Sequence, residues 1–327
     1  MTTIVRRVKR TRPSWISRFW AVVKYEMLWN IRKKKFIGVV IIAFVFATIG
    51  LALPLILSNV TGQSISSNPD YSISLTAGSF AFLLFALATA MNSISSEFES
   101  GTIVPLLTKP VSRTMVFLGK LFAVFIIILV SYAILFTYSV IGNIIVYGPQ
   151  NNLHLIPLAL LGDMISTFIW VAIIFAIGAL SKNTIVAALV ALGFYLALSV
   201  ALPAVSFFTG PSTSLNYVPG SGASGTLDVA IGQNMTIQNV TVNTMTSIST
   251  GTDTIGTNLI KYVLYPSANV NFTRISVFLA DPTEPPQLLY TESITFIVLR
   301  SIAIAFVYIF AFLLVAWYAF KRAQVLE

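Results

Sequence analysis

Residues 97–120 read EFESGTIVPLLTKPVSRTMVFLGK, and this polar stretch separates two long apolar runs of the chain. It is the only connection of any length that has a cytoplasmic character. Ser96 followed three residues later by Glu99 has the form of a capping box, in which the two side chains satisfy amides at a helix start. Gly101 then ends that turn. The stretch therefore predicts a surface element between two membrane spans.

A second short helix is predicted to follow the first. Thr102 can cap this helix, which carries Leu106 and Leu107. The helix ends before Pro110, because the residue preceding a proline disfavours the helical region. Ser112 can then cap the next helix. We interpret residues 97–120 as a short amphipathic helix between two hinges, whose leucines are free to dock on another protein.

The composition of the chain excludes a soluble protein. Of its 327 residues, 56% are hydrophobic and 9% are charged, whereas ordinary soluble domains carry about 25% charged residues. The absence of cysteine excludes disulfides, thiolate chemistry and iron–sulfur sites. The single histidine, His154, has no partners for a metal site. A polytopic membrane protein is the class that fits.

Six apolar runs are each long enough to cross a bilayer, which takes about 20 helical residues. They are residues 36–57, 72–94, 115–140 with an extension to 147, 154–180, 184–207 and 292–320. The sequence therefore predicts an all-α polytopic fold in four parts. These parts are residues 1–35, residues 36–208 with the polar element 96–113 inside them, residues 209–290 and residues 291–327.

The first part combines a basic arm with a predicted amphipathic helix over residues 14–31. Trp15, Phe19 and Val23 recur at helical spacing on one side, and charged residues that include Glu26 fill the other. Two Trp residues near the start are typical of a helix that lies on anionic lipid headgroups. Nucleic-acid binding by the basic arm is the alternative, but this arm directly precedes a span, and topology already accounts for its charge.

The basic residues also orient the predicted spans. Six crossings place both termini on one side, and among the basic residues only Lys261 and Arg274 fall clearly on the other. An excess of Lys and Arg in short connections marks the cytoplasmic side. We therefore predict a multi-pass plasma-membrane protein whose termini and residues 97–120 are cytoplasmic.

The outer connection, residues 209–290, is too long for a plain loop. Residues 209–225 are rich in Gly, Pro and Ser and indicate a linker, whereas residues 226–260 are rich in Thr, Val and Ile, which favours short strands. We predict a small, β-rich extracytoplasmic domain, whose few charges would suit an archaeal cell surface. N-glycosylation sequons occur on the predicted outer side only, at Asn59, Asn234, Asn239 and Asn271.

Asp163 and Arg300 are charged residues inside the fourth and sixth predicted spans. Each lies on the order of 12–15 Å from the outer end of its helix. Ionisable groups within a membrane are usually paired, so an Asp163–Arg300 ion pair is one prediction. The alternative is that these spans begin at Met164 and Ser301, which leaves both charges at the outer headgroups.

The fifth span carries a row of small residues at four-residue spacing, Gly193, Ala197 and Ala201, with Ala187 and Ala191 on a neighbouring row. Such rows let helix backbones approach closely in lipid. One interpretation is a seam with a second subunit, and the other is packing within one chain.

The polar stretch resembles the permease subunits of type-2 ABC exporters, which carry an E-x-E-x-G-T…L-L…P-x-S-R…G-K pattern between their second and third spans. The matching residues are Glu97, Glu99, Gly101, Thr102, Leu106, Leu107, Pro110, Ser112, Arg113, Gly119 and Lys120. The resemblance implies that this stretch is the coupling element that contacts an ATPase subunit. Its two leucines would be docking knobs and its two glutamates polar contacts.

The resemblance further implies an exporter subunit that is not itself an enzyme. The chain has no phosphate-binding loop of the form G-x-x-x-x-G-K-[ST] and no catalytic residue set, so no cofactor is expected on it. ATP and Mg would be bound by separate ATPase subunits. A second permease copy or a paralogue would pack through the first and fifth spans. The long outer connection departs from compact family members, where short re-entrant helices occupy this position.

Two other classes of function fit the same sequence. The first is an ABC-like subunit that moves no solute but transmits force to, or assembles, a cell-surface complex through its outer domain. The second is an ATP-independent membrane receptor or anchor. Finding an ATPase attached to the protein in its native membrane would exclude the receptor or anchor. Movement of a solute would exclude the subunit that only transmits force.

Overall fold

The computed structural model describes residues 14–32, 34–61, 79–99, 112–228, 234–237, 240–243, 246–274 and 287–322. The long helices are α1 (Trp15–Ile31), α2 (Lys34–Thr61), α3 (Ser79–Ala90), α6 (Arg113–Tyr147), α7 (Ile156–Ser181), α8 (Thr184–Thr209) and α10 (Ile294–Arg322). The shorter helical elements are α4 (Ser95–Glu99), α9 (Ile255–Leu264), η2 (Leu153–Leu155), η3 (Thr213–Tyr217) and η4 (Thr252–Thr254). The strands are β1 (Ser224–Asp228), β2 (Asn234–Ile237), β3 (Val240–Asn243), β4 (Thr246–Ser249), β5 (Asn269–Arg274) and β6 (Gln287–Ser293).

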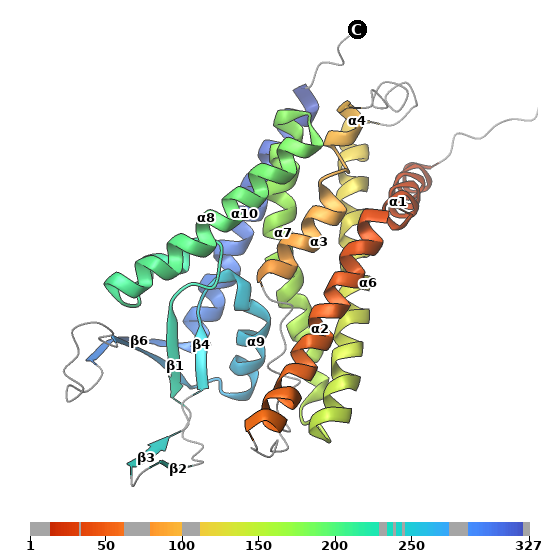
Figure 1. The fold of residues 1–327 in the computed structure, drawn as a ribbon. Helices are drawn as coiled ribbons and strands as arrows, with labels where there is room; N and C mark the ends of the chain where they lie inside the picture. The colour runs from red at the N-terminus through yellow and green to blue at the C-terminus, as the bar shows by residue number, and fades with distance from the viewer. Residues whose placement is uncertain are drawn as a thin grey trace, which may run out of the picture.

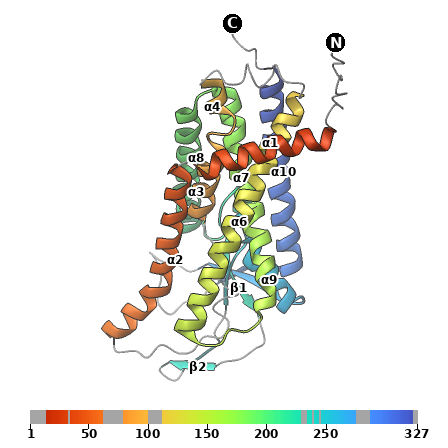
Figure 2. The same cartoon turned by 90° about the vertical axis from the view of Figure 1, so that its right-hand side faces the viewer.

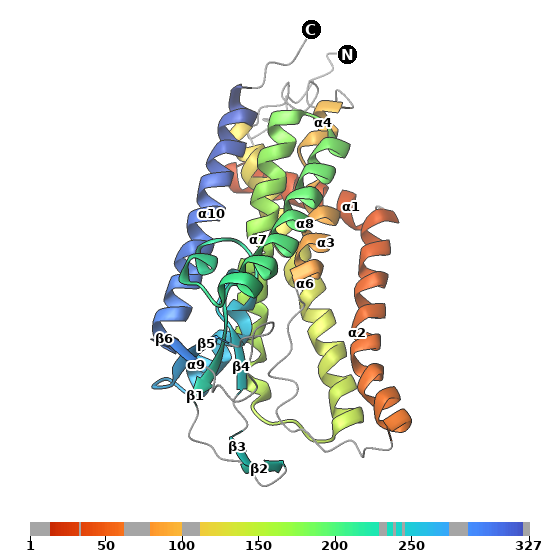
Figure 3. The same ribbon diagram turned by 60° about the vertical axis from the view of Figure 1, so that its left-hand side comes forward.

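Six helices in the described residues are long and apolar enough to cross a membrane, which confirms the predicted all-α polytopic fold. They run along one another, and a small sheet lies at one end of the bundle (Figure 1). We call this end the sheet end. The opposite end, where α4 and the last turn of α10 lie, is called the α4 end (Figure 3).

Helix α7 is the centre of the bundle, because it packs against α3, α8, α9 and α10. Its buried residues include Trp170, whose ring contacts Tyr195 of α8 at a centroid distance of 5.3 Å. Helices α2 and α8 are the least buried of the six candidate spans. Large apolar side chains cover both helices on their exposed sides. These two helices therefore present the most apolar surface to a membrane or to a partner.

Helix α1 lies across the bundle and packs on α6 (Figure 2). Ser14 caps it, because its hydroxyl accepts a hydrogen bond from the Ser17 amide at 3.2 Å. Trp15 and Trp20 are exposed on one side, while Val23 and Glu26 are buried against the bundle. The amphipathic helix predicted from the sequence is present, and Glu26 points inward rather than toward solvent.

The second span is interrupted by a turn over residues 91–94, after which α4 begins at Ser95. Asn and Ser side chains compete with helix hydrogen bonds, which explains a break at this place. Ser96 is the second residue of α4, and its hydroxyl donates to the Asn92 carbonyl. The predicted capping box that begins at Ser96 is therefore wrong.

The sheet is antiparallel with strand order β4-β1-β5-β6, and β2 and β3 form a separate hairpin. The small β-rich domain is confirmed, but its predicted boundaries need two corrections. Residues 255–264 form helix α9, although strands were predicted up to residue 260. The predicted linker contains η3, where the buried Asn216 accepts hydrogen bonds from the Ala223 amide at 2.9 Å and the Thr250 hydroxyl at 2.6 Å.

The sheet end is joined to the bundle by a close glycine contact. A Cβ atom added to Gly162 of α7 would lie 2.2 Å from Gly256 Cα of α9, so only glycine fits here. Two hydroxyls strengthen the joint: Ser166 donates to the Thr252 carbonyl at 2.5 Å, and Ser301 donates to the Thr250 carbonyl at 2.9 Å. The domain is therefore docked on α7 and α10 rather than tethered by a linker.

The glycine contact gives a stability prediction. We expect Gly162→Ala to destabilise the purified protein by about 1–3 kcal/mol, because the added methyl group meets backbone atoms that cannot rotate away. Thermal unfolding in detergent measures the effect. Gly50→Ala in α2 is the matched control, since a Cβ there meets nothing within 4 Å. Equal unfolding midpoints for the two variants would contradict the docking described here.

Candidate functional site

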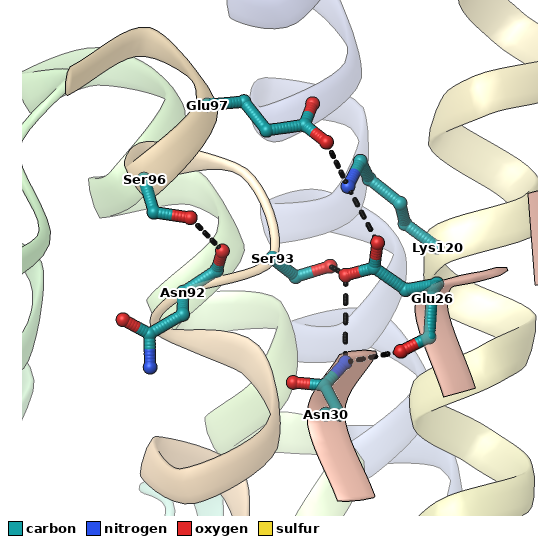
Figure 4. A network of polar contacts seen from close by, with 7 residues as sticks. All are labelled: Glu26, Asn30, Asn92, Ser93, Ser96, Glu97 and Lys120. Atoms are coloured by element: carbon teal, nitrogen blue, oxygen red, sulfur yellow. Dashed lines mark hydrogen bonds and ion pairs between the residues drawn. The ribbon is translucent and has the colours of Figure 1, made fainter. Parts of the chain in front are cut away.

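A buried cluster of charge lies at the α4 end, where α1, α4 and α6 meet. Lys120 Nζ of α6 lies 2.8 Å from Glu26 Oε2 of α1 and 2.7 Å from Glu97 Oε1 of α4. Lys120 is 2% exposed and Glu97 is 7% exposed. Figure 4 shows the lysine between the two carboxylates. Three elements from distant parts of the chain are thus held by one ammonium group.

Two polar side chains complete the coordination of Glu26. The Ser93 hydroxyl donates to Glu26 Oε1 at 2.8 Å, from the turn that interrupts the second span. Asn30 Nδ2 donates to the Glu26 carbonyl at 3.2 Å and more weakly to Oε1 at 3.4 Å. A buried charge is tolerated only when it is paired and hydrogen-bonded. Glu26, Asn30, Ser93, Glu97 and Lys120 are called the lysine cluster below.

Local sequence explains why the cluster forms at this point. A Cβ atom on Gly119 would lie 2.8 Å from Val22 Cγ1, so glycine allows α1 to cross close to α6. The neighbouring residue of α6 is Lys120, and Glu26 follows Val22 by one helical turn on α1. The turn at residues 91–94 then redirects the chain, so that Glu97 reaches the same ammonium group.

Both ends of the polar stretch are anchored to other helices. Glu99 Oε2 accepts a hydrogen bond from the Thr184 amide at the start of α8, at 3.4 Å. Phe98 packs edge-on against Phe320 of α10, with centroids 5.9 Å apart. At the other end, Arg113 Nη1 donates to the Lys321 carbonyl at 2.8 Å, near the end of α10.

The predicted coupling residues fall into two groups. Glu97, Glu99 and Arg113 are described, and each contacts another part of the same chain. Glu97 is buried against Lys120, whereas a polar contact with an ATPase was expected for this residue. Ser112 does cap α6, because its hydroxyl accepts from the Met115 amide at 3.1 Å. The remaining predicted residues lie outside the described residues: Gly101, Thr102, Leu106, Leu107 and Pro110.

The predicted Asp163–Arg300 ion pair is not the one observed. Arg300 Nη1 instead pairs with Glu292 Oε1 at 2.7 Å, at the start of α10. Asp163 is buried where α7 meets α9, and its Oδ1 would lie 2.9 Å from a Cβ atom on Gly256. The two residues share the sheet end of the bundle but belong to different contacts.

The two rows of small residues on α8 have different surroundings. Ala187 and Ala191 are buried within the bundle, next to α7. The row Gly193, Ala197 and Ala201 is exposed. The first row therefore packs inside the chain, and the second is open to a membrane or a partner.

The predicted glycosylation sites lie in different elements. Asn59 is near the end of α2, and Asn234 begins β2. Asn271 lies in β5, between two neighbouring strands, and its Oδ1 accepts from the Thr291 hydroxyl at 2.9 Å. Asn239 lies outside the described residues. Within the part of the chain that the structure describes, no group of three or more His, Cys, Asp or Glu residues could hold a metal ion.

Sequence reasoning missed the role of Glu26, Asn30 and Ser93. Glu26 is the one acidic residue among the basic residues of α1, since Arg18, Lys24 and Arg32 surround it in sequence. A single carboxylate on a cationic helix is a signal that an internal cation pairs with it. The partner itself, 94 residues along the chain, could not be identified from spacing.

Comparison with known proteins gives the family. The model of the ABC-2 family transporter proteins matches residues 20–325. No curated protein matches the chain. The matched range includes α1 from Trp20 onward, the lysine cluster, all six candidate spans and the sheet domain. The chain therefore belongs to the ABC-2 family of transporter proteins, as its resemblance to type-2 ABC permeases predicted.

Proposed function

We propose that the chain is the membrane-spanning permease subunit of an ABC exporter. Separate ATPase subunits would bind ATP and Mg, and the chain itself would carry no catalytic residue and no cofactor. The observation that supports this most directly is the anchoring of the polar stretch. Its described ends contact four helices, α1, α6, α8 and α10, so a push on the residues between them reaches most of the bundle.

The α4 end would face the cytoplasm, and both termini with it. Among the described residues, the basic ones concentrated there are Arg32, Lys34, Arg113, Lys120, Lys182, Lys321 and Arg322, and such an excess favours the cytoplasmic side of a plasma membrane. An ATPase could then reach residues 100–111. The sheet end would face outward, together with the predicted glycosylation sites.

Movement would pass from the ATPase into the bundle through the contacts at both ends of the stretch. Leu106 and Leu107 would dock on the ATPase, and the lysine cluster would carry the displacement to α1 and α6. Glu99 would carry it to the start of α8, and Arg113 to the end of α10. In this mechanism Glu97 acts as an internal link rather than as a contact with the ATPase.

A second permease copy or a paralogue would complete the transporter. Helices α2 and α8 are the least buried of the candidate spans, which fits a partner on these two helices. The exposed row Gly193, Ala197 and Ala201 would allow close approach of a partner helix. The glycines and alanines of this row are the residues we assign to the seam.

A second candidate function is transmission of force to a cell-surface complex without solute transport. The docking of the sheet domain on α7 and α10 favours it, because the domain would follow these helices as they move. Transport assays in vesicles separate the two functions. Hydrolysis that a surface partner stimulates, without solute movement, would support the second.

The docking role of Leu106 can be tested by charge. We expect Leu106→Asp to reduce co-purification of the ATPase, and the ATPase activity that the permease stimulates, by about tenfold or more, since a carboxylate does not fit an apolar pocket. Pull-down and hydrolysis assays in reconstituted membranes measure both effects. Leu288→Asp, at an exposed leucine of the sheet end, is the control. Full coupling in Leu106→Asp would argue against the proposed contact.

The lysine cluster makes a separate prediction about stability. We expect Lys120→Met to destabilise the protein by about 3–5 kcal/mol, because it leaves two buried carboxylates without their cation. Lys24→Met removes an exposed lysine of α1 and should have little effect. Thermal unfolding and yield from membranes compare the two variants.

A neutral cluster distinguishes a structural role from coupling. The triple variant Glu26→Gln, Glu97→Gln and Lys120→Met removes all three charges, so it should fold much better than Lys120→Met alone. We expect it to bind the ATPase but to stimulate hydrolysis poorly, since the link from α4 to α1 is lost. Wild-type stimulation by the triple variant would mean that the cluster only stabilises the fold.

A further inference from the structure

Arg300 lies at the sheet end with part of its guanidinium unused. Nη1 is paired with Glu292 Oε1 at 2.7 Å, and the rings of Phe296 and Tyr217 lie 5.1 Å and 6.0 Å from the guanidinium carbon. The residue is only 7% exposed. Nε and Nη2 nevertheless make no hydrogen bond. These two atoms form one of the flat edges through which arginine binds an oxyanion with two parallel hydrogen bonds.

Two further polar side chains near Arg300, Asn216 and Tyr290, have donor hydrogens to spare. Asn216 is 0% exposed, and its Oδ1 accepts from Ala223 and Thr250, which determines the orientation of the amide. Its Nδ2 makes no well-formed hydrogen bond but is directed at the Tyr290 oxygen, which leaves its second hydrogen spare. The Tyr290 hydroxyl has no acceptor for its own hydrogen, and the ring is stacked on Phe272 at 4.2 Å.

Chain geometry places these groups in one neighbourhood: Tyr290 lies two residues before Glu292 on β6, on the same face of the strand, and Asn216 directly precedes Tyr217, whose ring lies by Arg300. Burial raises the pKa of Tyr290 to about 12, and Glu292 adds to the effect, while Arg300 and the amide of Asn216 oppose it. Glu292 Oε2 also lacks a donor. The group therefore offers a guanidinium edge, an amide and a phenol as donors, and one carboxylate oxygen as acceptor.

Unsatisfied donors in a buried place are costly. A phosphate group would satisfy them together, because its oxygens point in several directions, whereas a planar carboxylate would meet the guanidinium edge alone. The spare oxygen of Glu292 suits a hydroxyl or an amine on the same ligand. Tyr217 is more than half exposed and covers the guanidinium, so its ring is the lid that would move to admit the ligand.

The depth of Arg300 in the bundle indicates the source of the phosphate. Helix α10 has 29 residues and is therefore ~43 Å long, whereas the hydrocarbon core is about 30 Å thick. The excess length extends ~7 Å beyond the core at each end, and Arg300, six residues after the start of α10, lies ~9 Å along its axis, so it lies at the boundary between the hydrocarbon core and the lipid headgroups. Phe296 and Leu299 are exposed beside it and would face acyl chains.

We propose that Arg300, Asn216, Tyr290 and Glu292 form a binding site for a phosphate group, supplied by the headgroup of a phospholipid in the leaflet at the sheet end. The Nε and Nη2 edge of Arg300 binds two phosphate oxygens. Asn216 Nδ2 and Tyr290 Oη donate to the others, and Glu292 accepts from a headgroup hydroxyl or amine. A lipid is thereby held at the joint between β6 and α10.

The test uses the full chain purified in detergent and three ligands. Phosphatidylglycerol and a diacylglycerol with the same acyl chains are titrated and followed by native mass spectrometry, and inorganic phosphate is followed by thermal unfolding. We expect phosphatidylglycerol to bind at least about tenfold more tightly than diacylglycerol. Arg300→Lys should abolish most of this difference, since it keeps the charge but removes the flat edge. Tyr290→Phe should weaken binding by about threefold, through the loss of one donor.

Lys261→Gln is the control, because it removes a cation of the same domain that is bonded elsewhere, to the Ser247 carbonyl. Stabilisation by inorganic phosphate that disappears in Arg300→Lys, with equal binding of both lipids, would support the phosphate site but assign it to a soluble anion. Ligand binding that neither Arg300→Lys nor Tyr290→Phe changes would overturn the site. If Arg300→Lys fails to fold, Tyr290→Phe decides alone, since it leaves the guanidinium in place.

Discussion

The ion cluster around Lys120 is the interaction on which the α4 end depends. Two carboxylates and one ammonium are buried within hydrogen-bond distance, and neither acid could stay buried without the lysine. Because Glu26, Glu97 and Lys120 come from α1, α4 and α6, the same charge that satisfies the carboxylates also sets where these helices lie. Gly119 allows the close contact of α1 with α6 that this pairing needs, since a side chain there would push α1 away from the lysine. The two ends of the polar stretch, at Glu97 and at Gly119-Lys120, thus meet in one contact.

The sheet end is held by a different kind of contact. Backbone meets backbone at Gly162 and Gly256, and hydroxyls of α7 and α10 bond to carbonyls of the domain. These uncharged contacts depend on the close approach of two backbones rather than on the pairing of opposite charges. They dock the domain directly on α7 and α10, so we expect it to follow these helices if they move.

The sequence predicted what depends on length and composition, and missed what depends on tertiary contact. Six apolar runs of sufficient length became six helices, because a lipid-exposed backbone has to satisfy its own hydrogen bonds. The first part of α9, up to Ile260, was predicted as strand because residues 226–260 are rich in Thr, Val and Ile, yet it is helical and packs on α7 through Gly256. In the candidate site, the motif identified Glu97 and Lys120 as important. Their pairing with Glu26 depends on where α1 lies, which no local pattern reports. The choice of Glu292 over Asp163 as the partner of Arg300 likewise follows from β6, which brings Glu292 within reach of α10.

One continuous helix, α10, connects the two ends of the bundle. Arg113 binds the last turn of α10 at the α4 end, and α10 runs unbroken to Ile294. Strand β6 ends at Ser293, the residue directly before α10, and pairs with β5 along the sheet. Under the proposed function, a displacement at the polar stretch would therefore reach the sheet through one continuous helix and strand. Arg300 lies on this route just beyond its junction, with Glu292 on the strand and the guanidinium on the helix. A phosphate bound there would link strand to helix and stiffen the junction, so the lipid at the sheet end would influence how much of the displacement the domain receives.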